Sequence, residues 1–145
     1  MELSVLANLY GSKPLDEALK TISSLGVHSV EIGAGGYPGK DHCDPEKLLA
    51  DPKALEEFKN TFKKYDVEIC ALATHGNPVH PNKAIAEQFD TDMRNTILLA
   101  EKLGIDTLKI SRKHLASLEI VQFMNVDSNE MNPDIWMKLS NSINQ

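Results

Sequence analysis

Four short apolar runs, each followed by a segment with helical periodicity, organise most of this chain. The apolar runs cover residues 3–9, 27–33, 67–73 and 105–110. Between them, apolar side chains recur every three or four positions, which places them on one face of a helix. Strands that alternate with helices at a spacing of roughly 30–40 residues are typical of βαβ units and a parallel sheet. The pattern therefore predicts an α/β fold.

The expected helices have clear start and stop signals. Pro14 stands where a missing backbone N–H costs nothing, and Asn82 is placed to cap a long helix. Gly26 and Gly104 follow the last apolar residues of two helices, where a left-handed cap is expected. These signals predict helices over residues 14–25, 45–50, 52–65 and 82–103. The glycine-rich segment 34–39 lacks the spacing of nucleotide-binding loops, and we interpret it as a flexible connection between strand and helix.

After residue 110 the pattern loosens. A strand over residues 118–123 and a short helix over residues 133–143 are the elements that the tail suggests, with a polar loop between them. We therefore divide the chain into residues 1–110, which carry the repeating β and α pattern, and residues 111–145, a divergent tail.

Composition narrows the classes of partner. The formal net charge is -6 and the pI is about 5.3, without the clustered lysines and arginines that nucleic acid requires. No apolar run approaches the roughly 18 residues of a membrane span, and the first residues lack the basic segment and apolar core that are typical of a signal peptide. We expect a soluble, cytoplasmic protein without a nucleic-acid or membrane partner.

The two cysteines give no metal signature. Cys43 and Cys70 lie far apart in the sequence, without the CxxC spacing of a zinc site. Cys70 lies within an apolar run and is expected to pack as a small hydrophobic residue. Cys43 lies beside His42 and Asp44, where a plain loop residue is favoured over a reactive thiol or a metal ligand.

The strongest chemical signal is a loop with two histidines directly after the third strand. His75 and His80 lie there among glycine, asparagine and proline residues. Imidazoles at a strand end can bind a divalent metal or exchange protons near neutral pH. Two histidines are an incomplete metal site, so His75 and His80 are also candidates for substrate contact. The alternative is that they only hydrogen-bond the backbone of a proline-containing loop.

Two further candidates lie at the ends of the first two strands. Glu31 lies between Val30 and Ile32, so its carboxylate is expected on the opposite face of the sheet from those two side chains. There it could orient a substrate hydroxyl, or it could form a salt bridge. Asn8 ends the first apolar run and occupies a comparable position. Lys109 in the fourth run is a weaker candidate for contact with an anionic substrate.

These segments together resemble a known family. The runs LSVLANLYG, LGVHSVEIGAGGYPG, VEICALATHGNPVHP and AEKLGIDTLKI are similar to the N-terminal half of the sugar-phosphate isomerase/epimerase family with a xylose-isomerase-like TIM barrel. CALATHGNPVHP is the most discriminating of these segments. The resemblance covers about residues 2–110 and implies half of a (β/α)₈ barrel, with four parallel strands.

The resemblance implies a metal-dependent aldose–ketose isomerase or epimerase that acts on a sugar or sugar phosphate. In that family a divalent ion (manganese, magnesium, zinc or cobalt) polarises an oxygen while carboxylates move a proton between adjacent carbons. By analogy, His75 matches the strand-three histidine that faces the active site, and Glu31 matches a residue at the mouth of strand two. A related endonuclease branch uses its strand-three histidine as a zinc ligand, but the acidic composition makes that branch the less favoured.

The family's metal ligands come from strands five to eight, which have no counterpart in this sequence. We therefore expect a truncated barrel that carries the substrate-facing half, with weak turnover or none. The alternative function is non-catalytic: a half-barrel remnant, or a module that self-associates through exposed sheet edges. A flavodoxin-like binding domain is a third interpretation, supported by fold analogy alone.

Overall fold

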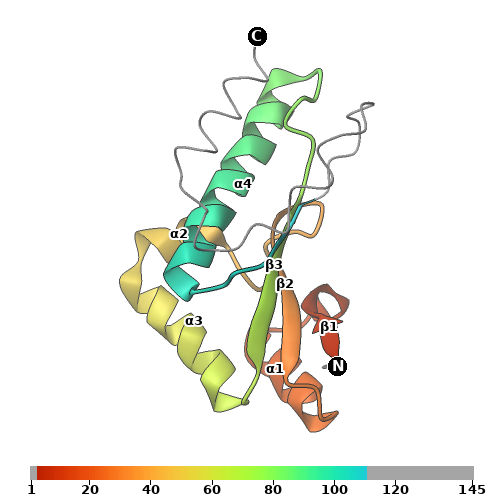
Figure 1. Ribbon diagram of the computed structural model, residues 1–145, viewed down its shortest axis with the longest axis vertical. Helices are drawn as coiled ribbons and strands as arrows, with labels where there is room; N and C mark the ends of the chain where they lie inside the picture. Colours follow the sequence, from red (N-terminus) through yellow and green to blue (C-terminus); the bar gives the residue numbers. More distant parts are fainter. Residues whose placement is uncertain (1–2, 111–145) are drawn as a thin grey trace.

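The computed structural model describes residues 3–110, and these form one four-stranded parallel sheet with the strand order β1-β2-β3-β4. Figure 1 shows helices α2, α3 and α4 together on one side of the strands. This arrangement confirms the predicted α/β fold with four parallel strands, as in the first half of a TIM barrel. The elements are β1 (Ser4–Leu6), the 3₁₀ helix η1 (Ala7–Tyr10), α1 (Leu15–Ser24), β2 (Ser29–Gly36), α2 (Pro45–Ala50), α3 (Pro52–Lys64), β3 (Glu68–His75), α4 (Lys83–Leu103) and β4 (Leu108–Lys109).

The helices begin and end where the sequence signals predict. The Asn82 side chain accepts hydrogen bonds from the first backbone N–H groups of α4, and the Asp51 side chain does the same for α3. Gly104 ends α4 in a left-handed conformation with φ of 68°, and Gly26 follows α1 with φ of 74°. These caps set the residues at which α3 and α4 begin and at which α1 and α4 end.

The hydrophobic core lies on the face of the sheet that the helices cover. Val30, Ile32 and Ala34 are fully buried at every second position of β2, and Leu72 is the partner of Ile32 on β3. Because side chains alternate across a strand, Glu31 points to the opposite face, as predicted. The helices contribute the remaining large buried side chains: Leu19, Ile22, Phe58, Phe62, Met93 and Leu99.

The strand ends differ from the sequence prediction. β1 stops at Leu6, so Asn8 lies in η1 and not at the end of a strand. β2 continues to Gly36, into the glycine-rich segment that the sequence predicts to be a flexible connection. β3 includes His75 as its last residue. Glycine within a strand often marks the close approach of another part of the chain. A Cβ on Gly35 would lie 2.9 Å from the Asp92 side chain of α4, and a Cβ on Gly36 would overlap the His75 backbone of β3.

The sequence predicts an inward stripe on α4 formed by Ile85, Phe89, Met93, Ile97, Ala100 and Leu103. This stripe is confirmed only in part: Met93 and Ala100 are buried, but Ile85 is 40% exposed, and Asp92, Thr96 and Leu99 are buried as well. Figure 1 shows the reason: the first turns of α4 extend past the ends of the strands and have no sheet beneath them. Only the later turns pack on β2 and β3.

β2 and β3 change register twice along their shared ladder. Val30 pairs with Ile69 but Glu31 pairs with Ala71, so Cys70 is an extra residue on β3. A second shift, between Gly33 and Gly35, places the extra residue on β2. Cys70 is exposed and not buried as predicted, and its thiol donates to the Val30 carbonyl at 3.2 Å.

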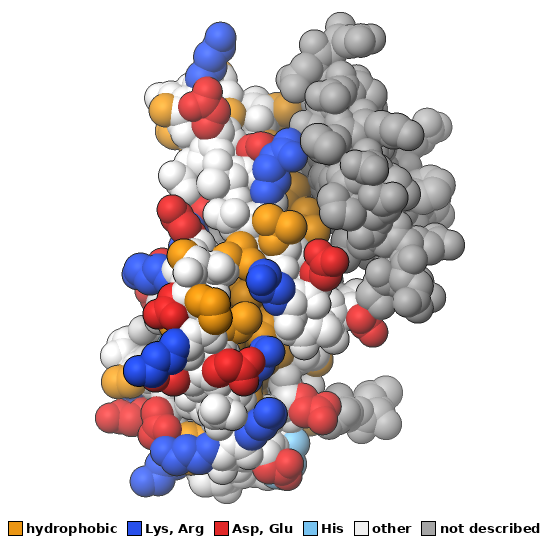
Figure 2. Space-filling model, turned by 90° about the vertical axis from the view of Figure 1, so that its left-hand side faces the viewer, with side chains coloured by type: hydrophobic (Ala, Val, Ile, Leu, Met, Phe, Trp, Pro, Cys, Tyr) orange, Lys and Arg blue, Asp and Glu red, His pale blue; other side chains and the backbone are white. Residues whose placement is uncertain are grey.

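The strand and helix suggested for residues 111–145 lie outside the described residues. No helix within residues 3–110 is long and apolar enough to cross a membrane. Figure 2 shows lysine, arginine and acidic side chains interspersed over one face of the molecule, with apolar side chains exposed between them. This face therefore carries charges of both signs.

Candidate functional site

Glu31 forms an ion pair across the sheet with Lys109. Their charged atoms lie 2.5 Å apart, between β2 and β4, on the face opposite the helices. The Glu31 side chain is only 14% exposed, and its hydrogen bond and charge raise the pKa of Lys109. The structure thus brings together two residues that the sequence suggested separately. A paired carboxylate and ammonium can still donate to and accept from substrate hydroxyls at this face.

His75 closes the carboxyl end of β3 and is half-buried. Its backbone carbonyl accepts a hydrogen bond from the Tyr37 N–H at 2.7 Å, and its ladder partner is Gly36. A Cβ on Gly36 would lie 2.0 Å from the His75 carbonyl oxygen. Glycine is therefore required at position 36, and the two strand ends are locked together there.

The structure does not bring His75 and Glu31 into contact. Glu31 is level with Ala71, four residues before His75 on β3. A rise of about 3.3 Å per residue separates the two positions by about 13 Å along the sheet. His75 therefore lies at the carboxyl edge of the sheet, and Glu31 lies farther from that edge, on the neighbouring strand β2.

Sequence reasoning missed a buried ion pair between α4 and the loop after β2. Asp92 is 6% exposed in its side chain and lies 2.6 Å from the Lys40 ammonium. Its carboxylate also accepts from the Gly36 N–H at 3.0 Å and from the Gln88 side chain at 2.9 Å. One turn later, the Thr96 hydroxyl donates to the Ala34 carbonyl at 3.1 Å. These contacts attach α4 to the end of β2.

A faint sequence signal for this network was present. Asp92 and Thr96 are spaced four apart and flank apolar residues on the buried side of α4. Because a buried carboxylate needs partners, an acidic residue within the apolar stripe of a helix indicates a hidden polar contact. The identity of Lys40 as the partner follows only from the fold.

Asn8 uses its side chain to connect η1 with β2. Its amide oxygen accepts from the Gly33 N–H at 3.2 Å, and its amide nitrogen donates to the Pro38 carbonyl. A shallow polar depression beside it is lined by Asn8, Gly11, Gly33, Pro38, Asp41 and His42. It has essentially no enclosed volume, so it does not form a ligand pocket. Asn8 has a structural role, and a substrate contact stays a prediction.

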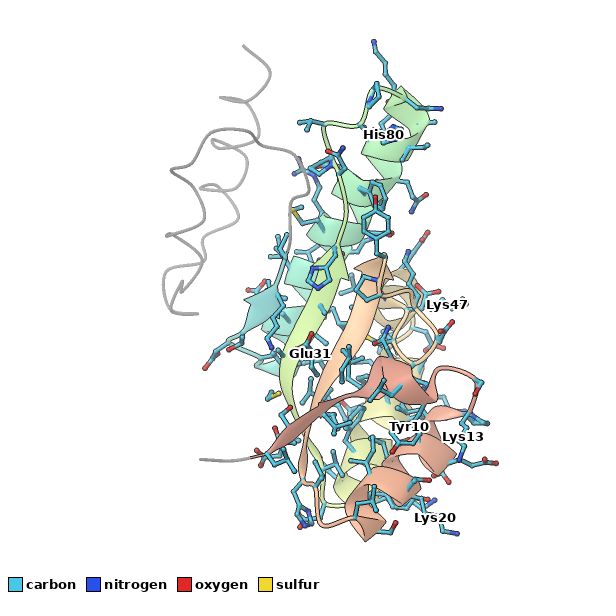
Figure 3. The ribbon with its side chains drawn as sticks, turned by 90° about the vertical axis from the view of Figure 1, so that its right-hand side faces the viewer. Tyr10, Lys13, Lys20, Glu31, Lys47 and His80 are labelled. Carbon is cyan, nitrogen blue, oxygen red and sulfur yellow. The ribbon has the colours of Figure 1, made fainter. Side chains whose placement is uncertain are left out.

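His80 lies apart from the other candidates. Figure 3 shows it near the far end of the loop after β3, well removed from Glu31 on the sheet. Its Nδ1 accepts a hydrogen bond from the Asn82 N–H at 3.0 Å, just before α4 begins. This local contact matches the structural alternative for His80, and a role in substrate binding stays a prediction.

Cys43 has the properties of an unreactive thiol. It is almost fully buried, and burial, together with the charge of Asp44, raises its pKa to about 12. The thiolate is the nucleophile and the metal ligand, so a thiol that stays protonated at neutral pH is poorly suited to either task. This observation favours the plain structural interpretation of Cys43.

The described residues do not fit the divalent metal that the sequence resemblance implied. Within residues 3–110, no group of three or more histidine, cysteine, aspartate or glutamate side chains could share one ion. Structural and catalytic metal sites generally use three or four protein ligands. A ligand role for His75 would therefore need partners beyond this part of the chain, and no chemical step is assigned to a metal here.

Comparisons with known proteins agree with this fold. The chain is 30% identical over 106 residues to the uncharacterized protein YfiH of Bacillus subtilis (strain 168), which covers 72% of this chain and 33% of that protein. The chain thus spans about a third of that curated relative. The crystal structure of protein SMc04130 from Sinorhizobium meliloti 1021 shares the fold, with a TM-score of 0.52 and 18% identity, over 81% of this chain and 38% of that chain.

A family match covers most of the sequence. The model of the xylose isomerase-like TIM barrel family matches residues 19–137. This match continues past residue 110, where the sequence places the start of a tail, and that boundary stays a prediction. The chain belongs to the xylose isomerase-like TIM barrel family, which includes sugar isomerases and epimerases.

Proposed function

We propose that this chain supplies the substrate-facing N-terminal half of a sugar or sugar-phosphate isomerase or epimerase. The observation that most supports this proposal is the position of His75, the last residue of β3. Active sites of (β/α)₈ barrels lie at the carboxyl ends of the strands, built from residues like this one. Family membership supports a small polyhydroxylated substrate.

In this proposal, His75 binds the substrate and Glu31 orients one of the substrate hydroxyls. The imidazole of His75 can donate to or accept from a substrate hydroxyl at the carboxyl edge of the sheet. Glu31 and Lys109 present a neutralised pair deeper on the same face. The proposal assigns binding and not chemistry to this half, because the described residues hold no metal cluster. Isomerisation by the purified chain with manganese or cobalt would contradict the expected lack of turnover.

Binding can be tested by nuclear magnetic resonance titration with D-xylose, D-fructose and their phosphate esters. We expect saturable shifts for residues near His75, and His75→Ala should weaken binding about tenfold, the value of one good hydrogen bond. His28→Ala is the matched control. His28 lies at the opposite end of the sheet, just before β2, where its Nδ1 bonds the Asp66 carbonyl at 2.7 Å. Equal effects of both variants, or no saturable shift with any sugar, would refute the proposal.

A self-associating half barrel is the second candidate, favoured by the open sheet. Among the described strands, β1 pairs only with β2 and β4 pairs only with β3. Leu3 and Leu9, which flank β1, are 70% and 77% exposed, and Leu6 within it is 41% exposed. Unpaired edges with apolar side chains favour association. Sedimentation that shows a monomer over the full accessible concentration range would count against this function.

A cytoplasmic location and the lack of a nucleic-acid partner stay predictions from composition.

A further inference from the structure

Tyr37 is strongly exposed and yet held in place. It directly follows β2, and 68% of its surface is accessible. Its backbone N–H donates to the His75 carbonyl at 2.7 Å. Its ring contacts Phe89 of α4, with ring centroids 5.4 Å apart and planes tilted by 47°. Tyrosine is enriched at binding interfaces, because its ring offers an apolar surface while its hydroxyl stays in contact with water.

The support beneath the ring is closely packed. Phe89 packs so closely on Gly76 that a Cβ there would lie 2.3 Å from the Phe89 ring. On the other side, Gly36 precedes Tyr37 and is bonded to the buried carboxylate of Asp92. Tyr37 is therefore anchored to the residues that flank the His75 end of β3. An aromatic surface prepared in this way loses little conformational entropy when a ligand arrives.

The chemistry of this group of residues matches a sugar. A monosaccharide has hydroxyl edges and an apolar face of C–H groups. An aromatic ring can pack against the C–H face while an imidazole at the same strand end hydrogen-bonds a hydroxyl, and ligand sites commonly combine apolar walls with a few polar groups. Tyr37 also carries a hydroxyl that can donate and accept.

We propose that Tyr37 is a substrate-binding residue whose ring, supported by Phe89, packs against the C–H face of the sugar that His75 binds. This inference rests on the proposed function. It adds an aromatic surface to the site, and this surface is supplied by the turn after β2. No candidate residue suggested by the sequence lies on this turn.

The test compares Tyr37→Ala and Tyr37→Phe in the full chain, with D-xylose and D-fructose titrated against each. We expect Tyr37→Ala to raise Kd at least about fivefold and Tyr37→Phe to change it less than about twofold, because the ring and not the hydroxyl makes the contact. Leu25→Ala is the matched control, since Leu25 is equally exposed at 67% but lies after α1. Sugar-induced shifts of the Phe89 ring should disappear in Tyr37→Ala alone.

The outcomes separate the two proposals. Unchanged binding in Tyr37→Ala, together with weakened binding in His75→Ala, would overturn the role of Tyr37 and leave the proposed function standing. Loss of binding in Tyr37→Phe as large as in Tyr37→Ala would also overturn the packing role. No binding of either sugar by the unaltered chain would refute both.

Discussion

Gly36→Ala is expected to lower the free energy of unfolding by about 3–5 kcal/mol, which combines an overpacking cost with the penalty for a left-handed residue. The new Cβ would lie 2.0 Å from the His75 carbonyl oxygen and 2.6 Å from its carbon, and both are backbone atoms that cannot turn aside. Gly36 also has a φ of +64°, which side chains disfavour. Urea unfolding followed by circular dichroism measures the change.

Gly26→Ala is the control for this substitution. Gly26 has a similar φ of +74°, but a Cβ there would meet nothing within 4 Å. It should cost only the left-handed penalty of about 1–2 kcal/mol. Equal losses for the two variants would show that the contact with His75 does not restrict the strand ends.

Lys40→Met is expected to lower the free energy of unfolding by about 2–3 kcal/mol, below the roughly 3–5 kcal/mol for loss of one partner of a fully buried pair, because Lys40 retains some contact with water. The substitution leaves the nearly buried carboxylate of Asp92 without its cation. Partial burial alone lowers the pKa of Lys40, but the hydrogen bond and charge of Asp92, with help from Asp44 and Glu46, raise it overall. Urea unfolding at neutral pH measures the loss.

The sign of the pH dependence follows from that raised pKa. The pair contributes its full stability below the ordinary lysine pKa and loses it only as the pH rises through the higher folded value. Lys40→Met should therefore have the same effect from pH 6 to pH 9. A difference between the variant and the unaltered chain that vanishes near neutral pH would contradict this account.

Two further variants test whether the stability lost in Lys40→Met comes from the uncompensated charge of Asp92. Lys47→Met removes an ammonium that lies 3.0 Å from Asp44 but is 82% exposed, and it should cost about 0–1 kcal/mol. The double variant Lys40→Met with Asp92→Leu removes both charges and should recover part of the stability, because an apolar pair of similar volume needs no desolvation. A double variant that is less stable than Lys40→Met would indicate that the Gly36 hydrogen bond matters more than the charges.

The order of strands and helices could be predicted because each element has a local signal. Apolar runs identify strands, and Asn82 and Gly104 mark the ends of α4 by the hydrogen bonds and backbone angles that they favour. Alternation along β2 alone predicts the face of the sheet on which Glu31 lies. Properties that depend on neighbours along the chain were therefore accessible from the sequence.

Properties that depend on distant neighbours were not accessible. The glycine-rich segment 34–39 predicts a loop, but its first residues pair with β3 as part of β2, and α4 packs closely on them: a Cβ on Gly35 would lie 2.9 Å from the Asp92 side chain. The partner of Asp92 is 52 residues away (92 minus 40), and no local pattern identifies it. No sequence pattern identifies Tyr37, because its contacts with His75 and Phe89 exist only once three elements meet.

The two register shifts between β2 and β3 have a consequence for how this region can change. Ser29 pairs with Glu68 and Gly36 pairs with His75, so the same offset of 39 residues holds at both ends of the ladder (68 minus 29, 75 minus 36). The extra residue at Cys70 is compensated by the extra residue between Gly33 and Gly35. Deleting either one alone would slip the strand by one residue and turn its side chains to the wrong face. Insertions and deletions in these two strands are therefore tolerated only as compensating pairs, and an alignment of relatives should show them together.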